Sequence, residues 1–221
     1  MKIMYKKIFI SLLVFFSLNL WAEKKEAVVE NSKQRIEQLD DMDFIEMLNS
    51  VDVGKASSLI QKFQNKEGKN KLLNGKYHPS GECTVEAFRN KEVLLITIPS
   101  YLLFSPNSTE LMDNAHEYLV PIKRYLKDPD MFRVLLVMHT DNTGSEIYRD
   151  QLTSDRVNSI FDWFDQEVPD TRYLFSYAMG DDMPLYPNNS IENREKNRRL
   201  EIYLVPGSKM VEQALKGRIA F

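Results

Sequence analysis

An apolar run, a polar turn and a long amphipathic stripe follow one another near the middle of the chain, and they constrain its fold most. Residues 132–138 are mostly β-branched or apolar, which predicts a buried strand of a covered sheet. Beyond the turn, apolar residues recur at steps of three and four, which predicts an amphipathic helix over residues 145–166. Gly144 permits a left-handed backbone in the turn. Asp141 is therefore expected at the carboxyl end of a strand beside a helix start, where ligands bind in open α/β sheets.

The rest of the chain supplies further elements in an order that predicts the fold class. Alternating and apolar segments predict an antiparallel hairpin of strands at 82–88 and 93–99 and later strands at 173–178 and 199–205. A helical stripe covers residues 109–126, and Pro121 inside it should kink or end the helix. The order βαβαββ predicts a two-layer α/β fold, with helices on one face of a mixed sheet.

Composition divides the chain into four parts. Residues 23–80 carry two short amphipathic stripes, at 28–48 and 54–63, followed by a polar stretch read as a linker. Two such helices cannot bury a core of their own, so they either pack on the main domain or form a spacer. The main domain is expected at residues 81–206, with a solvated tail at 207–221.

The amino-terminal stretch has the shape of a secretory signal. Three lysines precede an apolar run at residues 8–20, and Ala22 stands just before a charged segment. The run is shorter than the ~20 residues that a membrane-spanning helix needs. Residues 1–22 are therefore predicted to be a signal peptide, which implies export to the periplasm and a processed chain that begins at Glu23.

Charge and cysteine usage exclude some function classes. The chain has 29 basic and 32 acidic residues, and loss of the three signal lysines leaves 26 basic residues and a net charge of −6. No broad basic surface is implied, so nucleic acid is not an expected partner. Cys83 is the only cysteine, so no internal disulfide can form, and a buried thiol is expected.

The candidate binding chemistry consists of one anion and one cation. Asp141 and Arg156 could together satisfy a zwitterion, because arginine binds a carboxylate in a two-pronged geometry. Asn107, Thr143 and backbone amides at the helix start could add neutral hydrogen bonds. On spacing alone the alternative is favoured, in which Asp141 caps the loop and Arg156 pairs with Asp155 or another surface acid.

Three motifs in order resemble one family. The first is the helix entry at residues 103–111, and the last is the Asn-Arg-Arg segment within residues 193–200. The central motif is His139-Thr140-Asp141-x-x-Gly144-Ser145-x-x-Tyr148, then Leu152-Thr153-x-x-Arg156. Together they closely resemble the OmpA C-terminal-like domain, which Pal lipoproteins and flagellar MotB share. Matching pieces cover about residues 92–205.

The resemblance implies a function and a set of site residues. Family members bind peptidoglycan stem peptides at meso-diaminopimelate, and an Asp and an Arg fifteen residues apart clamp its free end. Here these residues match Asp141 and Arg156, and the family's Asn in the helix entry matches Asn107. Arg198 matches the Arg that helps to shape the site, although a solvated basic cluster is an equal alternative for it. For Arg199 the solvated alternative, paired with an acid such as Glu201, is favoured.

The sequence departs from the family pattern near the site. Met138 replaces a usual Gly and could crowd the strand end, and Arg149 replaces a usual Asn and adds a positive charge. Thr153 for Ser and Val157 for Ala are small changes. These departures bear on the strength of binding more than on the fold.

No pattern indicates an enzyme, a metal or a cofactor. His139 lacks partners at metal-ligand spacing and is expected to be a buried histidine bonded to backbone. Nucleophile-elbow, metalloprotease and phosphate-loop motifs are all missing from the sequence. The expected function is therefore non-catalytic binding of peptidoglycan by an exported envelope protein at the outer membrane or cell wall. The alternative is a scaffold that has lost the ligand and binds an envelope protein through residues 23–70.

Overall fold

The computed structural model describes residues 37–68, 72 and 82–221. The chain divides into two compact units, Met1–Asp43 and Phe44–Phe221, and the sheet and the candidate site lie in the second. The predicted signal peptide, its cleavage site and the first part of the stripe at 28–48 lie outside the described residues.

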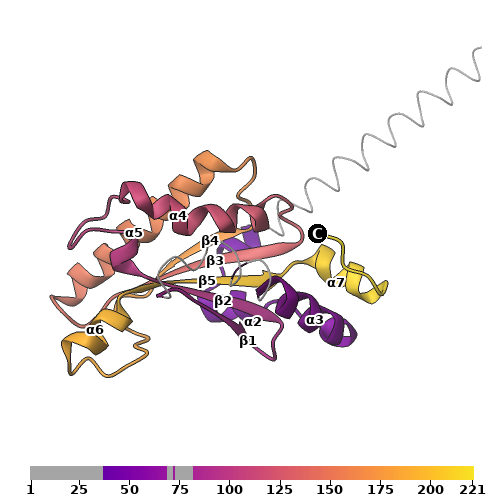
Figure 1. Ribbon diagram of the computed structural model, residues 1–221, viewed down its shortest axis with the longest axis horizontal. Coiled ribbons are helices and arrows are strands. Elements are labelled where there is room, and N and C mark those ends of the chain that lie inside the picture. Colours follow the sequence, from indigo (N-terminus) through magenta and orange to yellow (C-terminus); the bar gives the residue numbers. More distant parts are fainter. Residues whose placement is uncertain (1–36, 69–71, 73–81) are drawn as a thin grey trace, which may run out of the picture. The chain divides into compact units, whose positions relative to one another are not determined.

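Five strands of the second unit form one mixed sheet (Figure 1). The order across the sheet is β1-β2-β5-β3-β4, so the last strand in sequence lies in the middle. β3 and β4 are parallel, and the other neighbouring pairs are antiparallel. The predicted two-layer α/β class and the predicted hairpin are confirmed. The bounds are Thr84–Phe88 for β1, Val93–Pro99 for β2, Phe132–His139 for β3, Leu174–Ala178 for β4 and Arg199–Pro206 for β5.

One face of the sheet carries the main core. Leu136 of β3 stands opposite Ile202 of β5, which stands opposite Ile96 of β2, and all three are fully buried. Residues two positions away point to the same face because side chains alternate along a strand. α5 (Glu146–Glu167) covers β3 and β4 on this face and buries Ile160 and Phe164 in the core.

A short helix, α2 (Phe44–Asn49), packs against the opposite face. The ring of Phe44 lies 5.2 Å from that of Tyr203 in β5 and 5.7 Å from that of Tyr177 in β4. Tyr203 points away from the main core because it alternates with Ile202. The structure thus adds a helix on the second face to the predicted one-sided arrangement.

Pro121 breaks the predicted helix over residues 109–126 into short pieces. These are η4 (Asp113–Ala115), α4 (His116–Leu119) and the 3-10 helix η5 (Val120–Leu126), in which the proline is the second residue. Proline has no amide hydrogen to donate, so a regular helix cannot continue through it.

The compact unit extends beyond the predicted range 81–206 on both sides. Ile60 of α3 (Ser57–Glu67) and Met210 of α7 (Ser208–Leu215) are fully buried in the main core. The buried Gln64 side chain donates to the Leu204 carbonyl at 3.1 Å. Of the two alternatives for the segment at 54–63, packing on the main domain is therefore the one observed.

A short helix before β5 was also not expected from the sequence. α6 (Ile191–Asn197) begins at Ser190, whose hydroxyl accepts a hydrogen bond from the Asn193 amide at 3.1 Å. The helix lies at one end of the sheet, and α3 and α7 lie at the other end (Figure 1). It leads directly into β5 and so positions Arg198.

Candidate functional site

The turn between β3 and α5 holds Asp141 at the strand end. Ser145 is the N-cap of α5, and its hydroxyl accepts from the Tyr148 amide at 3.3 Å. Gly144 has a φ of 89°, and a Cβ at this position would lie 2.8 Å from the Tyr148 ring. Only glycine fits this conformation and this close approach.

Asp141 is a buried carboxylate with two partners. It is 2% exposed, it accepts from the Thr143 amide at 2.7 Å, and it forms an ion pair with the Arg198 guanidinium. Burial raises the pKa of Asp141, but hydrogen bonds from Thr143 and Arg198 outweigh burial and hold this pKa below its usual value. Asp141 is therefore ionised at neutral pH and ready to meet a cation.

Arg156 is also buried, at 4% exposure. It holds the loop at residues 105–108, which we call the facing loop. Its Nε donates to the Ser108 carbonyl at 2.8 Å and its Nη2 to the Ser105 carbonyl at 3.4 Å. Its guanidinium lies 4.9 Å from the centre of the Phe104 ring. Burial lowers the pKa of Arg156, and the positive charge of Arg198 lowers it further. Arg198 therefore links the two predicted partners, because it pairs with Asp141 and repels Arg156.

Asn107 lies in the loop that Arg156 holds. Its backbone is left-handed, with φ at 58°, a conformation that asparagine tolerates better than most residues. The Tyr148 hydroxyl donates to its side-chain oxygen at 3.2 Å. This bond ties the loop to the first turn of α5.

The predicted binding of one zwitterion by Asp141 and Arg156 requires the two side chains to lie close together, and this closeness stays a prediction. α5 begins at Glu146, so Arg156 lies ten residues further on, or ~15 Å along the axis at 1.5 Å per residue. Asp141 pairs with Arg198, whose charge acts on Arg156, and Arg156 in turn holds the facing loop. The predicted capping of the turn by Asp141 is observed, whereas Arg156 bonds to carbonyls rather than to Asp155 or another surface acid.

The two larger departures from the family pattern are accommodated. The Arg149 Nε pairs with Asp181 at 2.7 Å, and its Nη1 donates to the Gly144 carbonyl at 2.7 Å. The charge of Arg149 is thus compensated and helps to fix the turn. Met138 is fully buried in the main core, where it fills space between the sheet and its helices.

Comparison with known proteins shows which family this arrangement is similar to. The family model of the OmpA family matches residues 103–198. This part of the chain therefore resembles an OmpA-like domain. The match contains all five predicted site residues, and it begins at the entry to the facing loop and ends at Arg198.

Curated relatives cover part of the same region. The probable lipoprotein YiaD of Escherichia coli (strain K12) is 24% identical over 122 residues, which are 55% of this chain and 56% of the relative. The outer-membrane lipoprotein YfiB of Pseudomonas aeruginosa is 31% identical over 107 residues, 48% of this chain and 63% of the relative. The chain thus matches little more than half the length of these relatives.

Solved structures share the fold of the OmpA-like domain. A putative MotB-like protein from Desulfovibrio vulgaris superposes with a TM-score of 0.59 at 22% identity, over 68% of this chain and 98% of that one. The cell wall anchor of the type VI secretion system of Pseudomonas aeruginosa gives a TM-score of 0.51 at 22% identity, over 66% and 96%. At this identity the likeness concerns the fold.

A buried polar network lies behind the site of the OmpA-like domain. Glu201, 4% exposed, accepts from Arg199 at 2.7 Å and from the Tyr203 hydroxyl at 2.6 Å, and it lies 3.3 Å from His139 Nε2. The Arg199–Glu201 pairing anticipated from the sequence is thus present, but both residues are buried rather than solvated. His139 was expected to bond to backbone and instead meets Glu201. His139 at the end of β3 stands opposite Arg199 at the start of β5. The Glu201 carboxylate therefore joins the ends of these two strands, which lead into the site.

Acid should weaken this network. Burial raises the pKa of Glu201, but hydrogen bonding to His139 and the charge of Arg199 outweigh burial and hold this pKa at about 2. The folded-state pKa lies below the ordinary value of about 4.5, so the ionised carboxylate stabilises the fold at pH values above about 4.5. This contribution is lost as the pH falls from about 4.5 towards 2. The free energy of unfolding of the wild type should therefore fall more steeply over this range than that of Glu201→Gln, measured by urea unfolding. Equal slopes would contradict the assignment.

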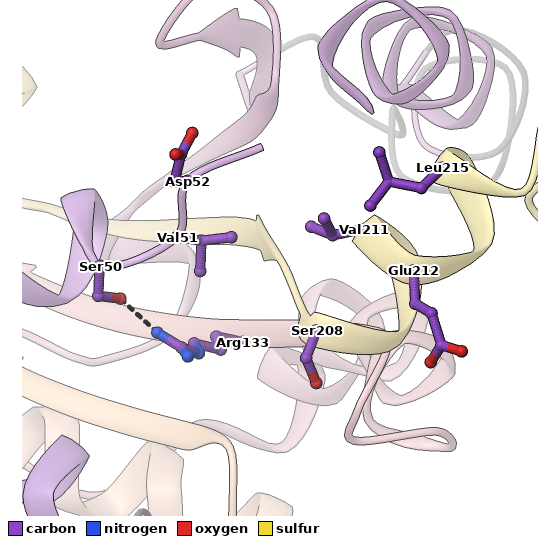
Figure 2. Close-up of a pocket in the computed structure, with 8 residues that line it drawn as sticks. All are labelled: Ser50, Val51, Asp52, Arg133, Ser208, Val211, Glu212 and Leu215. Carbon is purple, nitrogen blue, oxygen red and sulfur yellow. Dashed lines mark hydrogen bonds between the residues drawn. The ribbon is translucent and has the colours of Figure 1, made fainter. Parts of the chain in front are cut away.

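A pocket lies elsewhere on the second unit, at the opposite end of β3. It has a volume of about 340 Å³, and Arg133 at the start of β3 reaches into it and donates to the Ser50 hydroxyl (Figure 2). None of the predicted site residues lines it. The remaining lining residues are Val51, Asp52, Ser208, Val211, Glu212 and Leu215.

The described residues meet neither the requirements of a metal site nor those of a membrane-spanning helix. Among residues 37–68, 72 and 82–221, no group of three or more His, Cys, Asp or Glu side chains could hold a metal ion. The same part of the chain has no helix of the length and apolarity needed to cross a bilayer.

Proposed function

We propose that this OmpA-like domain binds peptidoglycan without catalysing a reaction, as part of an exported protein of the bacterial cell envelope. The family match supports this proposal, as does similarity to an outer-membrane lipoprotein and to the fold of a cell wall anchor. The proposed location is the periplasm, at the outer membrane or the cell wall.

The proposed ligand is the free end of meso-diaminopimelate in a stem peptide, which carries an ammonium and a carboxylate on one carbon. Asp141 would accept from the ammonium, and the carboxylate would lie between Arg156 and Arg198. The observation that carries this proposal is a buried carboxylate in contact with one guanidinium whose charge also acts on a second, buried guanidinium.

The two guanidinium groups of the site suit the carboxylate of such a ligand. One carboxylate and two guanidinium groups leave one positive charge in excess, and the two cations repel each other. A ligand carboxylate between Arg156 and Arg198 would replace repulsion by attraction. Arginine also offers the paired donors that match both carboxylate oxygens.

Neutral hydrogen bonds would complete recognition. Asn107 lies on the loop that Arg156 holds and contacts Tyr148, and the Thr143 side chain is exposed at the mouth of the turn. Both residues can therefore donate to or accept from the peptide groups of a stem. Their role would be to orient the ligand rather than to supply most of the binding energy.

The second candidate function is a scaffold that binds an envelope protein through residues 23–70. The observation in its favour is the pocket of Figure 2, because Ser50, Val51 and Asp52 belong to this segment and line it. Its aliphatic wall suits an apolar side chain of a partner. This function does not need Asp141 or Arg156.

Two stem tripeptides that differ by one carboxylate test the proposed function. L-Ala–D-Glu–meso-diaminopimelate and L-Ala–D-Glu–L-Lys differ only in the group proposed to lie between the arginines. A hydrogen-bonded charge contributes about 1.5–3 kcal/mol, so the first peptide should bind about tenfold more tightly or better in calorimetry. Equal affinities would refute the ligand assignment. Failure to bind either peptide or whole sacculi would refute the function and favour the scaffold.

A further inference from the structure

Large apolar side chains are exposed next to the ionic site. Ile147 is 83% exposed, Ile191 75%, Leu185 54%, Tyr186 44% and Met183 41%. We call these five residues the apolar rim. Single exposed apolar residues are common on protein surfaces, but several on segments that contact one another indicate an interaction surface. Whether these residues form one surface depends on the contacts between the three segments that carry them, which are the start of α5, the loop after β4, and α6.

Hydrogen bonds hold these three segments together. Asp181, at the start of the loop that carries three rim residues, pairs with Arg149 of the first turn of α5 at 2.7 Å. At the other side of the loop, the Asn197 side chain accepts from the Tyr186 amide at 3.0 Å and donates to the Tyr186 carbonyl at 2.7 Å. The loop is thus fixed between the first turn of α5, which carries Ile147, and α6, which carries Ile191.

The rim borders the ionic site directly. Asn197, which holds Tyr186, is followed by Arg198, the partner of Asp141. The Arg199 guanidinium donates to the Met183 carbonyl at 3.0 Å and so fixes the loop against the start of β5. A polymer with one group bound at Asp141 can therefore leave the site across this surface.

We propose that the apolar rim binds the sugar chain of peptidoglycan; this inference rests on the proposed function. A stem peptide is covalently attached to the sugar chain, so a bound stem brings sugars close to the site. The rim side chains are uncharged, which suits a neutral polymer better than an anionic surface. The faces of pyranose rings expose C–H groups that pack on aromatic rings and aliphatic chains, and tyrosine adds a hydroxyl that can bond to sugar oxygens. The Nζ of Lys196 in α6 lies over the Tyr186 ring, 5.1 Å from its centre.

The test is the double variant Ile147→Ser, Tyr186→Ser, with affinities measured for three probes. These are sacculi, the free diaminopimelate tripeptide, and sugar chains from which the stems have been removed. The variant should bind the tripeptide as the wild type does but bind sacculi about tenfold more weakly, since two buried apolar contacts are lost. Stem-free sugar chains should bind the wild type and not the variant. The control variant Ile45→Ser, Val120→Ser removes two exposed apolar side chains away from the rim and should change none of these affinities.

The outcomes separate this inference from the proposed function. Wild-type affinity of the double variant for sacculi, with tripeptide binding intact, would overturn the rim proposal alone. Rim-dependent binding of sugar chains by a wild type that ignores the tripeptide would support the rim and overturn stem recognition. Rim-dependent binding to phosphatidylethanolamine–phosphatidylglycerol vesicles, without sugar binding, would overturn the proposal in favour of a membrane surface. Rim-dependent self-association, again without sugar binding, would overturn it in favour of a second copy of this chain.

Discussion

The substitution Asp141→Asn is expected to weaken binding to diaminopimelate-containing sacculi at least about tenfold. Asparagine keeps an oxygen that can accept from the Thr143 amide, but it has no charge for the ligand ammonium. Loss of one side of a desolvated, hydrogen-bonded charge pair costs ~2–5 kcal/mol, and each 1.4 kcal/mol is about tenfold in affinity. Co-sedimentation with sacculi and calorimetry with the diaminopimelate tripeptide measure the loss.

The fold should survive this change, because the Arg198 side chain is 37% exposed and can be solvated by water when its partner is lost. Asp162→Asn is the matched control, since it makes the same charge change at an exposed position on α5. The control should bind as the wild type does. A folded Asp141→Asn variant with unchanged affinity would refute the clamp between Asp141 and the two arginines.

A second large effect is expected on stability, from Glu201→Ala. This change leaves the Arg199 guanidinium, 2% exposed, without its carboxylate and removes the partner of His139. Breaking a buried ion pair by removing one partner typically destabilises a protein by about 3–5 kcal/mol. Urea unfolding at pH 7 should show this loss as a lower midpoint with a similar slope.

Glu192→Gln is the control for Glu201→Ala. Glu192 pairs with Lys196 on the exposed surface of α6, where water solvates both charges in the folded and unfolded states. Its unfolding midpoint should match that of the wild type. A Glu201→Ala variant as stable as this control would contradict a structural role for the network.

Local patterns were sufficient to predict much of this fold. The run at 132–138 forms β3 because nearly all its residues can be buried, and the stripe after it forms α5 because its apolar positions follow the helical period. Pro121 was expected to disturb its helix, since a missing amide hydrogen acts at its own position. These properties depend on neighbours within a few residues, which the sequence lists directly.

Other features depend on residues far apart in sequence. The insertion of β5 between β2 and β3 follows from which apolar faces meet, and this choice carries Glu201 to His139, 62 residues away. The packing of α2 on the second face depends on Tyr203 and Tyr177, which are exposed to that helix only once the sheet has formed. No local pattern encodes these meetings.

The candidate site divides in the same way. The sequence by itself determined the β3–turn–α5 unit, the acid at its strand end and the glycine that its turn requires, because these depend on short-range periodicity and backbone conformation. The tertiary structure alone decided that Arg198 pairs with Asp141, that Arg156 turns to the carbonyls of Ser105 and Ser108, and that the apolar rim borders them. The physical reason is that an ion pair or a hydrogen bond needs its two groups within a few ångströms, and only the assembled sheet brings segments 48–57 residues apart to that distance.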